Sequence, residues 1–109
     1  MKTVLWIDDI RPAPANTDSI TYYHARSVFE AIALLLRSEY LGASYGAIDY
    51  IDTDHDAGDF IAQGGDYIEF LKFLECTDRN YPIRIHSMNP VGRDNMRAII
   101  VHNGWEEVK

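Results

Sequence analysis

Short apolar runs alternate with amphipathic stretches along the chain, and several of the runs end abruptly in polar residues. Thr3–Ile7 is β-rich and apolar on both faces, as expected of a central strand in a parallel sheet. Ile20–His24, Ala47–Thr53 and Pro82–His86 have the composition of three further strands. The intervals between the later runs are long enough for crossovers, so we expect parallel strands linked by helices.

The first predicted helix begins at a capping box, Ser27-Val-Phe-Glu30, and ends at Gly42. Four apolar residues recur at helical spacing and predict its buried stripe: Phe29, Ile32, Leu35 and Leu36. The preceding segment, Ile10–Ser19, contains Pro12 and Pro14. It is predicted to be an extended loop, because proline is incompatible with a helix interior.

Two further helices are predicted after the third and fourth strands. Asp66 has a favoured N-cap side chain and Glu69 follows three residues later. The buried stripe of that helix is predicted to be Tyr67, Ile68, Leu71 and Leu74. Asn89-Pro90 starts the last helix and Asn103-Gly104 ends it. Its predicted buried residues are Met96, Ile99 and Ile100, and Trp105–Val108 is expected to form a brief edge strand.

This order of elements predicts a doubly wound α/β fold with a parallel sheet. Residues 1–109 are expected to form one domain. In such folds ligands bind beyond the carboxyl ends of the strands. Three polar clusters lie there: Asp8-Asp9, Asp52–Gly58 and His86-Ser87. Because charged groups are rarely buried unless they are paired or bind a cation, we expect these clusters to form one site.

Composition narrows the class of protein. The 10 basic and 17 acidic residues give a net charge of −7, which disfavours non-specific binding to DNA or to anionic lipid. Cys76 is the only cysteine, which excludes an internal disulfide and favours a reducing compartment. The apolar run before Asp8 is too short for a signal peptide, and the longest run, Ala31–Leu36, is too short to span a membrane. A cytoplasmic protein is therefore predicted.

Two familiar ligand motifs fit the chain poorly. Asp52-Thr-Asp-His-Asp resembles the start of a calcium loop, but Ala57 occupies the glycine position and Gln63 the position of the bidentate glutamate. Gly64-Gly65 is not followed by the Gly-Lys-Ser/Thr of a phosphate loop. Trp6 is expected in the core.

An acidic pair after the first strand and an aspartate that ends the third resemble the response-regulator receiver fold. In receivers the pair holds Mg²⁺ and the strand-end aspartate accepts a phosphoryl group, and Asp8, Asp9 and Asp54 match these positions. The resemblance implies a receiver- or flavodoxin-like doubly wound fold with a parallel sheet of about five strands. The chain departs from receivers in that a loop replaces the first helix and in that histidines lie at the site. The lysine expected after the fifth strand has only Lys109 as a candidate.

A closer resemblance is to a diverged family, the cyclic-phosphate processing receiver domains. It is carried, in order, by Leu5-Trp-Ile-Asp-Asp-Ile-Arg-Pro12, Asp54-His-Asp-Ala-Gly58 and Ile85-His-Ser-Met-Asn-Pro-Val-Gly-Arg-Asp-Asn95. The last segment is the most specific, because His-Ser-x-Asn-Pro-x-Gly before a helix rarely arises by chance. The resemblance implies a hydrolase that acts on a cyclic phosphate, on a nucleotide or an RNA end.

Such a reaction needs charge stabilisation, an activated water and a proton for the leaving group. A divalent metal, Mg²⁺ or Mn²⁺, is expected, with the candidate ligands Asp8, Asp9, Asp54 and Asp56. Histidine exchanges protons near neutral pH. The candidate catalytic residues are therefore His55, His86 and Asp54, and the sequence leaves open which histidine is the acid and which is the base.

An anion site is expected after the fourth strand, where Asn89-Pro90 places a helix N-terminus. Arg11 or Arg93 can bind phosphate in a bidentate manner, and Gly92 permits close approach. The candidate phosphate-binding residues are Arg11, Ser87, Asn89, Gly92, Arg93 and Asn95.

Two non-catalytic functions remain open from the sequence. One is a signalling module that is phosphorylated on Asp54, and the other is a protein that binds and sequesters a nucleotide. If the protein hydrolyses or sequesters its ligand, the expected partner is a small phosphate-containing ligand or an RNA end. No membrane partner is expected.

Overall fold

A computed structural model describes residues 1–42 and 46–109. Its parallel sheet contains β1 (Lys2–Ile7), β2 (Ile20–Ala25), β3 (Tyr50–Thr53) and β4 (Ile83–Ile85). The strand order is β2-β1-β3-β4, which is the order of a receiver-like, flavodoxin-like fold. The predicted α/β class and parallel sheet are therefore confirmed.

Three of the strands differ from the prediction by one residue at one or both ends, and two differences are larger. β3 begins at Tyr50 rather than at Ala47. A fifth strand was expected at Trp105–Val108, but this segment makes only a single bridge, in which Glu107 pairs in parallel with Ile83. The sheet thus has four strands in the described residues.

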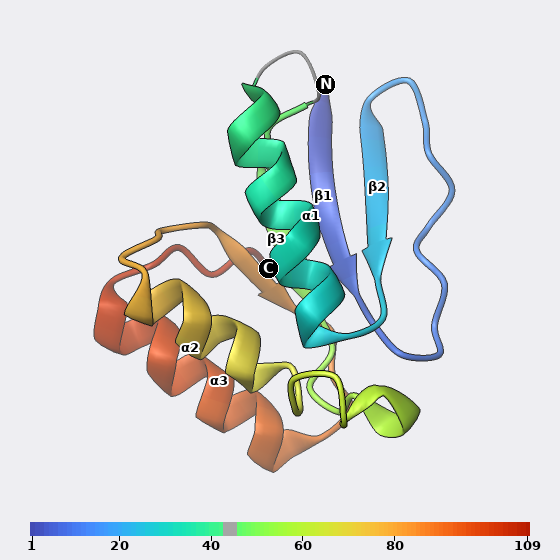
Figure 1. Cartoon of the computed structure of the whole chain (residues 1–109). Helices are drawn as coiled ribbons and strands as arrows, with labels where there is room; N and C mark the ends of the chain where they lie inside the picture. The colour runs from blue at the N-terminus through green and yellow to red at the C-terminus, as the bar shows by residue number, and fades with distance from the viewer. Residues whose placement is uncertain (43–45) are drawn as a thin grey trace.

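Three helices follow β2, β3 and β4: α1 (Val28–Leu41), α2 (Ile68–Cys76) and α3 (Pro90–Asn103). A short 3₁₀ helix, η2 (Gly58–Phe60), precedes α2. No helix lies between β1 and β2, where the predicted proline-bearing loop is confirmed (Figure 1). None of the helices in the described ranges is both long and apolar enough to cross a membrane.

The caps of α1 and α3 form as predicted, whereas that of α2 does not. Ser27 Oγ accepts a hydrogen bond from the Glu30 N–H, and Asn89 Oδ1 accepts one from the Gly92 N–H. At α2 the N-cap is Tyr67, and the Asp66 carboxylate accepts instead from the Ala57 N–H, 2.9 Å away. Asp66 therefore ties the loop after β3 to the start of α2.

The predicted buried stripe of α1 is wrong at two positions. Phe29 is 62% exposed and Leu36 is 41% exposed. The buried residues of α1 are Val28, Ala31, Leu35 and Ser38. Because α1 is apolar over much of its circumference, periodicity alone does not determine which face packs on the sheet.

The predicted stripes of α2 and α3 are largely confirmed. The predicted residues that are buried are Tyr67, Leu71, Leu74, Met96 and Ile100. Ile68 and Ile99 are half-buried against the same core, and Phe70 joins it although it was not predicted.

All three helices cover one face of the sheet, which contributes Leu5, Ile7, Ile51 and Ile83 to the core (Figure 1). The connections β2–β3 and β3–β4 run in the same direction across the sheet, so right-handed crossovers place α1 and α2 on the same side. The β1–β2 connection runs in the opposite direction, and it contains the loop rather than a helix. The chain thus winds in both directions from β1, as predicted, but in the described residues the second face has the loop in place of a helix layer.

The other side of the sheet, the helix-free face, is made by the alternate residues of the strands: Val4, Trp6, Tyr22, Tyr50, Asp52 and Arg84. Tyr22 and Tyr50 are register partners of Val4, and Asp52 is the partner of both Trp6 and Arg84. Arg11 and Pro14 of the β1–β2 loop lie over this face beside Trp6. The loop thus takes the place that a helix has in a doubly wound sheet.

Glu39 on α1 should contribute a small part of the acid stability. Its hydrogen bonds from Arg79 and Tyr81 outweigh burial and lower the pKa of Glu39. A lowered pKa adds stability above the unfolded value of about 4.3 and loses it as pH falls through the folded value. We expect Glu39→Gln to flatten the acid limb of the urea-unfolding free energy by no more than about 1 kcal/mol. An acid limb unchanged by the substitution would contradict this role.

Candidate functional site

Three carboxylates meet at the carboxyl ends of β1 and β3. Asp8 and Asp9 directly follow β1, and Asp54 directly follows β3, its N–H donating to the Ile7 carbonyl at 2.8 Å. One oxygen from each carboxylate lies within 4.8 Å of the others. The adjacency of β1 and β3 in the sheet therefore brings together residues 46 positions apart in the sequence.

Asp8 is the most constrained of the three carboxylates. Its Oδ1 accepts hydrogen bonds from the Ile10 and Arg11 N–H groups, and its Oδ2 lies 2.8 Å from His86 Nε2. Burial alone would raise the pKa of Asp8, but these hydrogen bonds and the His86 charge outweigh it and hold the pKa below its usual value. Asp8 is therefore held in place as an ionised carboxylate.

The pKa of Asp9 is shifted in the opposite direction to that of Asp8. Burial and the negative charges of Asp8 and Asp54 raise the pKa of Asp9. Gly58, at φ +53°, lies against the Asp9 carboxylate, and a β-carbon there would collide with Asp9 Oδ2. The chain thus keeps three mutually repelling carboxylates in contact. Their oxygens are the ligands that Mg²⁺ prefers, and a divalent cation would relieve their repulsion, so the residues fit a metal.

His86 lies between two buried carboxylates. Its Nε2 faces Asp8 and its Nδ1 lies 2.7 Å from Asp52 Oδ1, while its ring stacks on Trp6 with centroids 4.1 Å apart. Burial alone would lower the pKa of His86, but hydrogen bonds and charges from Asp52 and Asp8 outweigh it and raise the pKa. A carboxylate thus faces each ring nitrogen of a side chain only 5% exposed, and this arrangement favours the doubly protonated imidazolium, in which both nitrogens donate.

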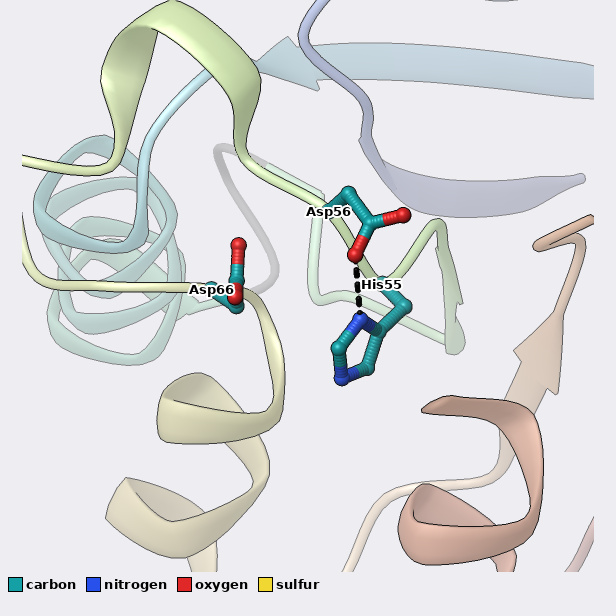
Figure 2. A group of neighbouring side chains, drawn as sticks. All are labelled: His55, Asp56 and Asp66. Carbon is teal, nitrogen blue, oxygen red and sulfur yellow. Dashed lines mark hydrogen bonds and ion pairs between the residues drawn. The ribbon is translucent and has the colours of Figure 1, made fainter. Parts of the chain in front are cut away.

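His55 belongs to a different group of side chains (Figure 2). Its Nδ1 lies 2.7 Å from Asp56 Oδ1, and Asp66 completes a group of three possible ligands within 4.8 Å. Asp56 Oδ1 also accepts a hydrogen bond from Asn89 Nδ2 at 3.3 Å. Asp56 therefore groups with His55 rather than with the three-carboxylate cluster, and the two histidines have separate partners.

A pocket of about 270 Å³, the acidic pocket, opens beside the carboxylates. It is lined by Arg11, Asp54, Asp56, His86, Ser87, Met88 and Asn89. Ser87 is buried, and its Oγ accepts a hydrogen bond from the Asn89 N–H at 3.1 Å. The structure thus gathers here three of the residues considered for metal binding or catalysis and three of those considered for phosphate, from three separate segments.

The other three phosphate candidates lie elsewhere. Arg93 lines a separate pocket of about 250 Å³ with Arg84 and Arg97. Asn95 is exposed on α3, and Gly92 is buried beneath the His55 ring. Gly92 therefore permits the close approach of the His55 ring.

A family model described as the cyclic-phosphate processing receiver domain matches residues 3–102. The chain belongs to this family. No curated protein and no solved structure matches it. Membership links the domain to cyclic-phosphate processing, and the Asp8, Asp9 and Asp54 cluster is the arrangement typical of a receiver metal site.

Sequence reasoning missed the environment of His86 in this cyclic-phosphate processing receiver domain. Asp52 was recognised only as part of a polar cluster, and Trp6 only as a core residue, yet both contact the His86 ring. The sequence feature that points to these contacts is the two-residue spacing of Trp6 and Asp8 and of Asp52 and Asp54. Residues spaced by two along an extended chain share a face.

Replacing Gly92 by alanine should destabilise the protein, because the new methyl group would lie 2.7 Å from His55 Cδ2 and Nδ1. Overpacking of this kind costs about 1–3 kcal/mol, against a helix-propensity gain of at most about 1 kcal/mol. We expect urea unfolding to show a net loss and the His55 ring resonances to shift. Asn95→Ala, an exposed change on the same helix, is the matched control and should be nearly neutral. A Gly92→Ala variant as stable as the parent would contradict the contact.

Proposed function

We propose that this domain is a metal-dependent phosphodiesterase that opens the ring of a cyclic phosphate. The observation that carries the proposal is the cluster of Asp8, Asp9 and Asp54, of which Asp54 lines a pocket together with Arg11 and Ser87. Carboxylates suited to a cation and an adjacent arginine are the groups needed to neutralise a phosphate and its transition state.

Asp8, Asp9 and Asp54 would hold the cation. When bound, a divalent metal polarises a phosphoryl oxygen and lowers the pKa of a water molecule. Asp8 has its orientation fixed by two backbone N–H groups and by His86. Asp54 is fixed at Oδ1 by the His55 N–H, 2.7 Å away. The ligands are therefore preorganised before a substrate enters.

Arg11 and Ser87 would bind the phosphate. The Arg11 N–H donates to Asp8 and the Arg11 carbonyl accepts from Trp6 Nε1, so the backbone of this arginine is held at both ends. Its side chain lines the acidic pocket and can reach a phosphate with paired N–H groups. The Ser87 oxygen is buried at the base of the same pocket.

Asp56 would accept the proton of the attacking water. It lines the acidic pocket, and its Oδ1 is held by His55 and Asn89. Water adds to phosphorus, one ring P–O bond breaks, and the displaced proton finally resides on the released hydroxyl oxygen, so the product is a phosphomonoester. His55 then acts by orienting Asp56, while His86 orients Asp8 and places positive charge beside the phosphate.

Phosphorus NMR tests the proposal directly. The protein is incubated with 2′,3′-cyclic and 3′,5′-cyclic mononucleotides in Mg²⁺, Mn²⁺ or EDTA. We expect the cyclic-phosphate resonance of at least one ring type to give way to a monoester resonance with metal and to persist in EDTA. Turnover that is equally fast in EDTA, or no turnover of any cyclic phosphate, would overturn the proposal.

Phosphorylation of Asp54 is the alternative that the same cluster allows. A receiver uses a lysine at this step, but Lys109 lines a different pocket and its Nζ lies 3.5 Å from Glu107. This position favours hydrolysis over phosphoryl storage. A stable mass gain on Asp54 after incubation with acetyl phosphate and Mg²⁺ would reverse that preference.

A further inference from the structure

We propose that the helix-free face is a nucleoside-binding subsite, so that the substrate is the cyclic phosphate of a mononucleotide. The assignment of the substrate class rests on the proposed function. The binding of a nucleoside to this face does not rest on the proposed function, because binding can be measured without hydrolysis of the ligand.

The acidic pocket is small for a site that encloses a whole nucleotide. Its volume of about 270 Å³ falls below the roughly 300–1,000 Å³ of most small-molecule sites. A second, larger pocket of about 460 Å³ lies on the helix-free face. It is lined by Trp6, Arg11, Pro14, Tyr22, Tyr50, Asp52, Arg84, His86, Val108 and Lys109.

The two pockets share Arg11 and His86 as lining residues. The alternation of strand side chains explains the connection. Along β1, Trp6 faces the larger pocket and Asp8 follows it on the same face, and Asp52 and Asp54 repeat this order along β3. One ligand can therefore place its phosphate at the carboxylates and its remaining bulk over the sheet.

Aromatic rings line the larger pocket. Tyr22 and Tyr50 flank Val4 from the two neighbouring strands, and both are half-buried. The Trp6 ring meets Tyr22 edge-on, with centroids 6.2 Å apart and an interplanar angle of 85°. Aromatic side chains on an open sheet surface are a recurrent platform for bases, and each stacked base is worth about 1–3 kcal/mol.

The larger pocket has only three arginine or lysine side chains in the part of its lining that the structure describes. Arg11, Arg84 and Lys109 line it, and Arg84 pairs with the buried Asp52 at 3.0 Å while its side chain stays 42% exposed. The chain as a whole carries a charge of −7, so a long polynucleotide would be repelled beyond these few cations. A mononucleotide, which carries one phosphate group, therefore fits this acidic chain better than an RNA strand does.

Substitution of the tyrosines tests the subsite. We expect Tyr50→Leu, and likewise Tyr22→Leu, to raise the KM for adenosine 2′,3′-cyclic phosphate about 5- to 100-fold with little change in kcat, as loss of stacking predicts. Tyr50→Phe keeps the ring and should retain the affinity. Tyr40→Leu, at a tyrosine 89% exposed on α1, is the matched control and should change nothing. Glycerol 1,2-cyclic phosphate has no base, so its KM should not respond to either tyrosine substitution.

A binding measurement in EDTA separates this inference from the proposed reaction. Adenosine 3′-monophosphate should shift the NMR resonances of Trp6 and Tyr50, bind at least tenfold more tightly than ribose 5-phosphate, and lose this advantage in Tyr50→Leu. That result without turnover of any cyclic phosphate would leave the subsite standing and remove the phosphodiesterase. Turnover with equal KM for both cyclic substrates, untouched by the tyrosine changes, would remove the subsite alone. Tighter binding of an oligoribonucleotide end than of the mononucleotide would overturn the assigned substrate class.

Discussion

Replacing Asp9 by asparagine should abolish metal-dependent turnover and yet stabilise the metal-free protein. The two effects have one cause. Burial and the charges of Asp8 and Asp54 raise the pKa of Asp9, so its carboxylate at neutral pH is destabilising in the absence of a cation. Neutralising it removes that repulsion, and it also removes an anionic ligand from the metal site.

The two effects differ greatly in size. A metal supplies several kcal/mol of transition-state stabilisation, and each 1.36 kcal/mol is tenfold in rate, so we expect a loss of about 10²–10³-fold or more. The gain in unfolding free energy in EDTA should stay below about 1 kcal/mol, because Asp9 is partly exposed to solvent. Turnover is followed by phosphorus NMR and stability by urea unfolding, each with and without Mg²⁺.

Asp59→Asn is the matched control for Asp9→Asn. Asp59 is exposed on η2 and lies outside the carboxylate cluster, so its removal changes the net charge equally but should alter neither turnover nor the stabilisation by Mg²⁺. A loss of stability in Asp9→Asn without metal would show that the three carboxylates do not repel one another as described. Full activity would exclude Asp9 from the metal site.

The carboxylate cluster could be predicted from the sequence because it depends on topology alone. Asp8, Asp9 and Asp54 directly follow apolar runs, and the carboxyl ends of neighbouring parallel strands meet at one edge of the sheet. Placing these residues together required the strand order but no detail of side-chain packing. The same reasoning placed Ser87 and Asn89 at this edge, where they line the acidic pocket.

The partners of the histidines could not be predicted in this way. His55 and His86 both follow strands, but His86 points to the helix-free face and meets Asp52, whereas the His55 ring packs on Gly92 of α3. Which side of the strand end each ring takes depends on the exit of the backbone after β3 and β4. The short apolar runs in the sequence do not determine the direction in which the backbone leaves each strand.

The uncovered face of the sheet was also beyond the sequence pattern. Thr3–Ile7 is apolar at nearly every position, as in a strand buried on both sides, because Val4 and Trp6 are covered by aromatic side chains and a loop rather than by helices. The sequence predicted the loop in place of the first helix. That this loop leaves a whole face of the sheet without a helix follows only from the strand order and the right-handed crossovers.

Replacing His86 by glutamine should be the most destabilising single change at the site. It removes the cation between Asp8 and Asp52, whose side chains are 4% and 5% exposed, and leaves both carboxylates without their shared partner. Breaking a buried ion pair by removing one member costs about 3–5 kcal/mol, which is a large part of the 5–15 kcal/mol that stabilises a typical domain. Loss of the ring stacked on Trp6 adds to the cost.

His24→Gln is the control that isolates charge from hydrogen bonding. The Nε2 of His24 lies 2.9 Å from the backbone carbonyl of Asp8, so this histidine contacts the same residue without bridging two carboxylates. Its replacement should cost about 0.5–1.5 kcal/mol, as for an ordinary hydrogen bond. Urea unfolding in EDTA compares the two variants, and equal losses would refute the bridging role of His86. Asp52→Asn should then lower the unfolding free energy less in the His86→Gln background than in the parent protein. In that background the Asp52 carboxylate no longer pairs with a cationic histidine, so its removal loses less.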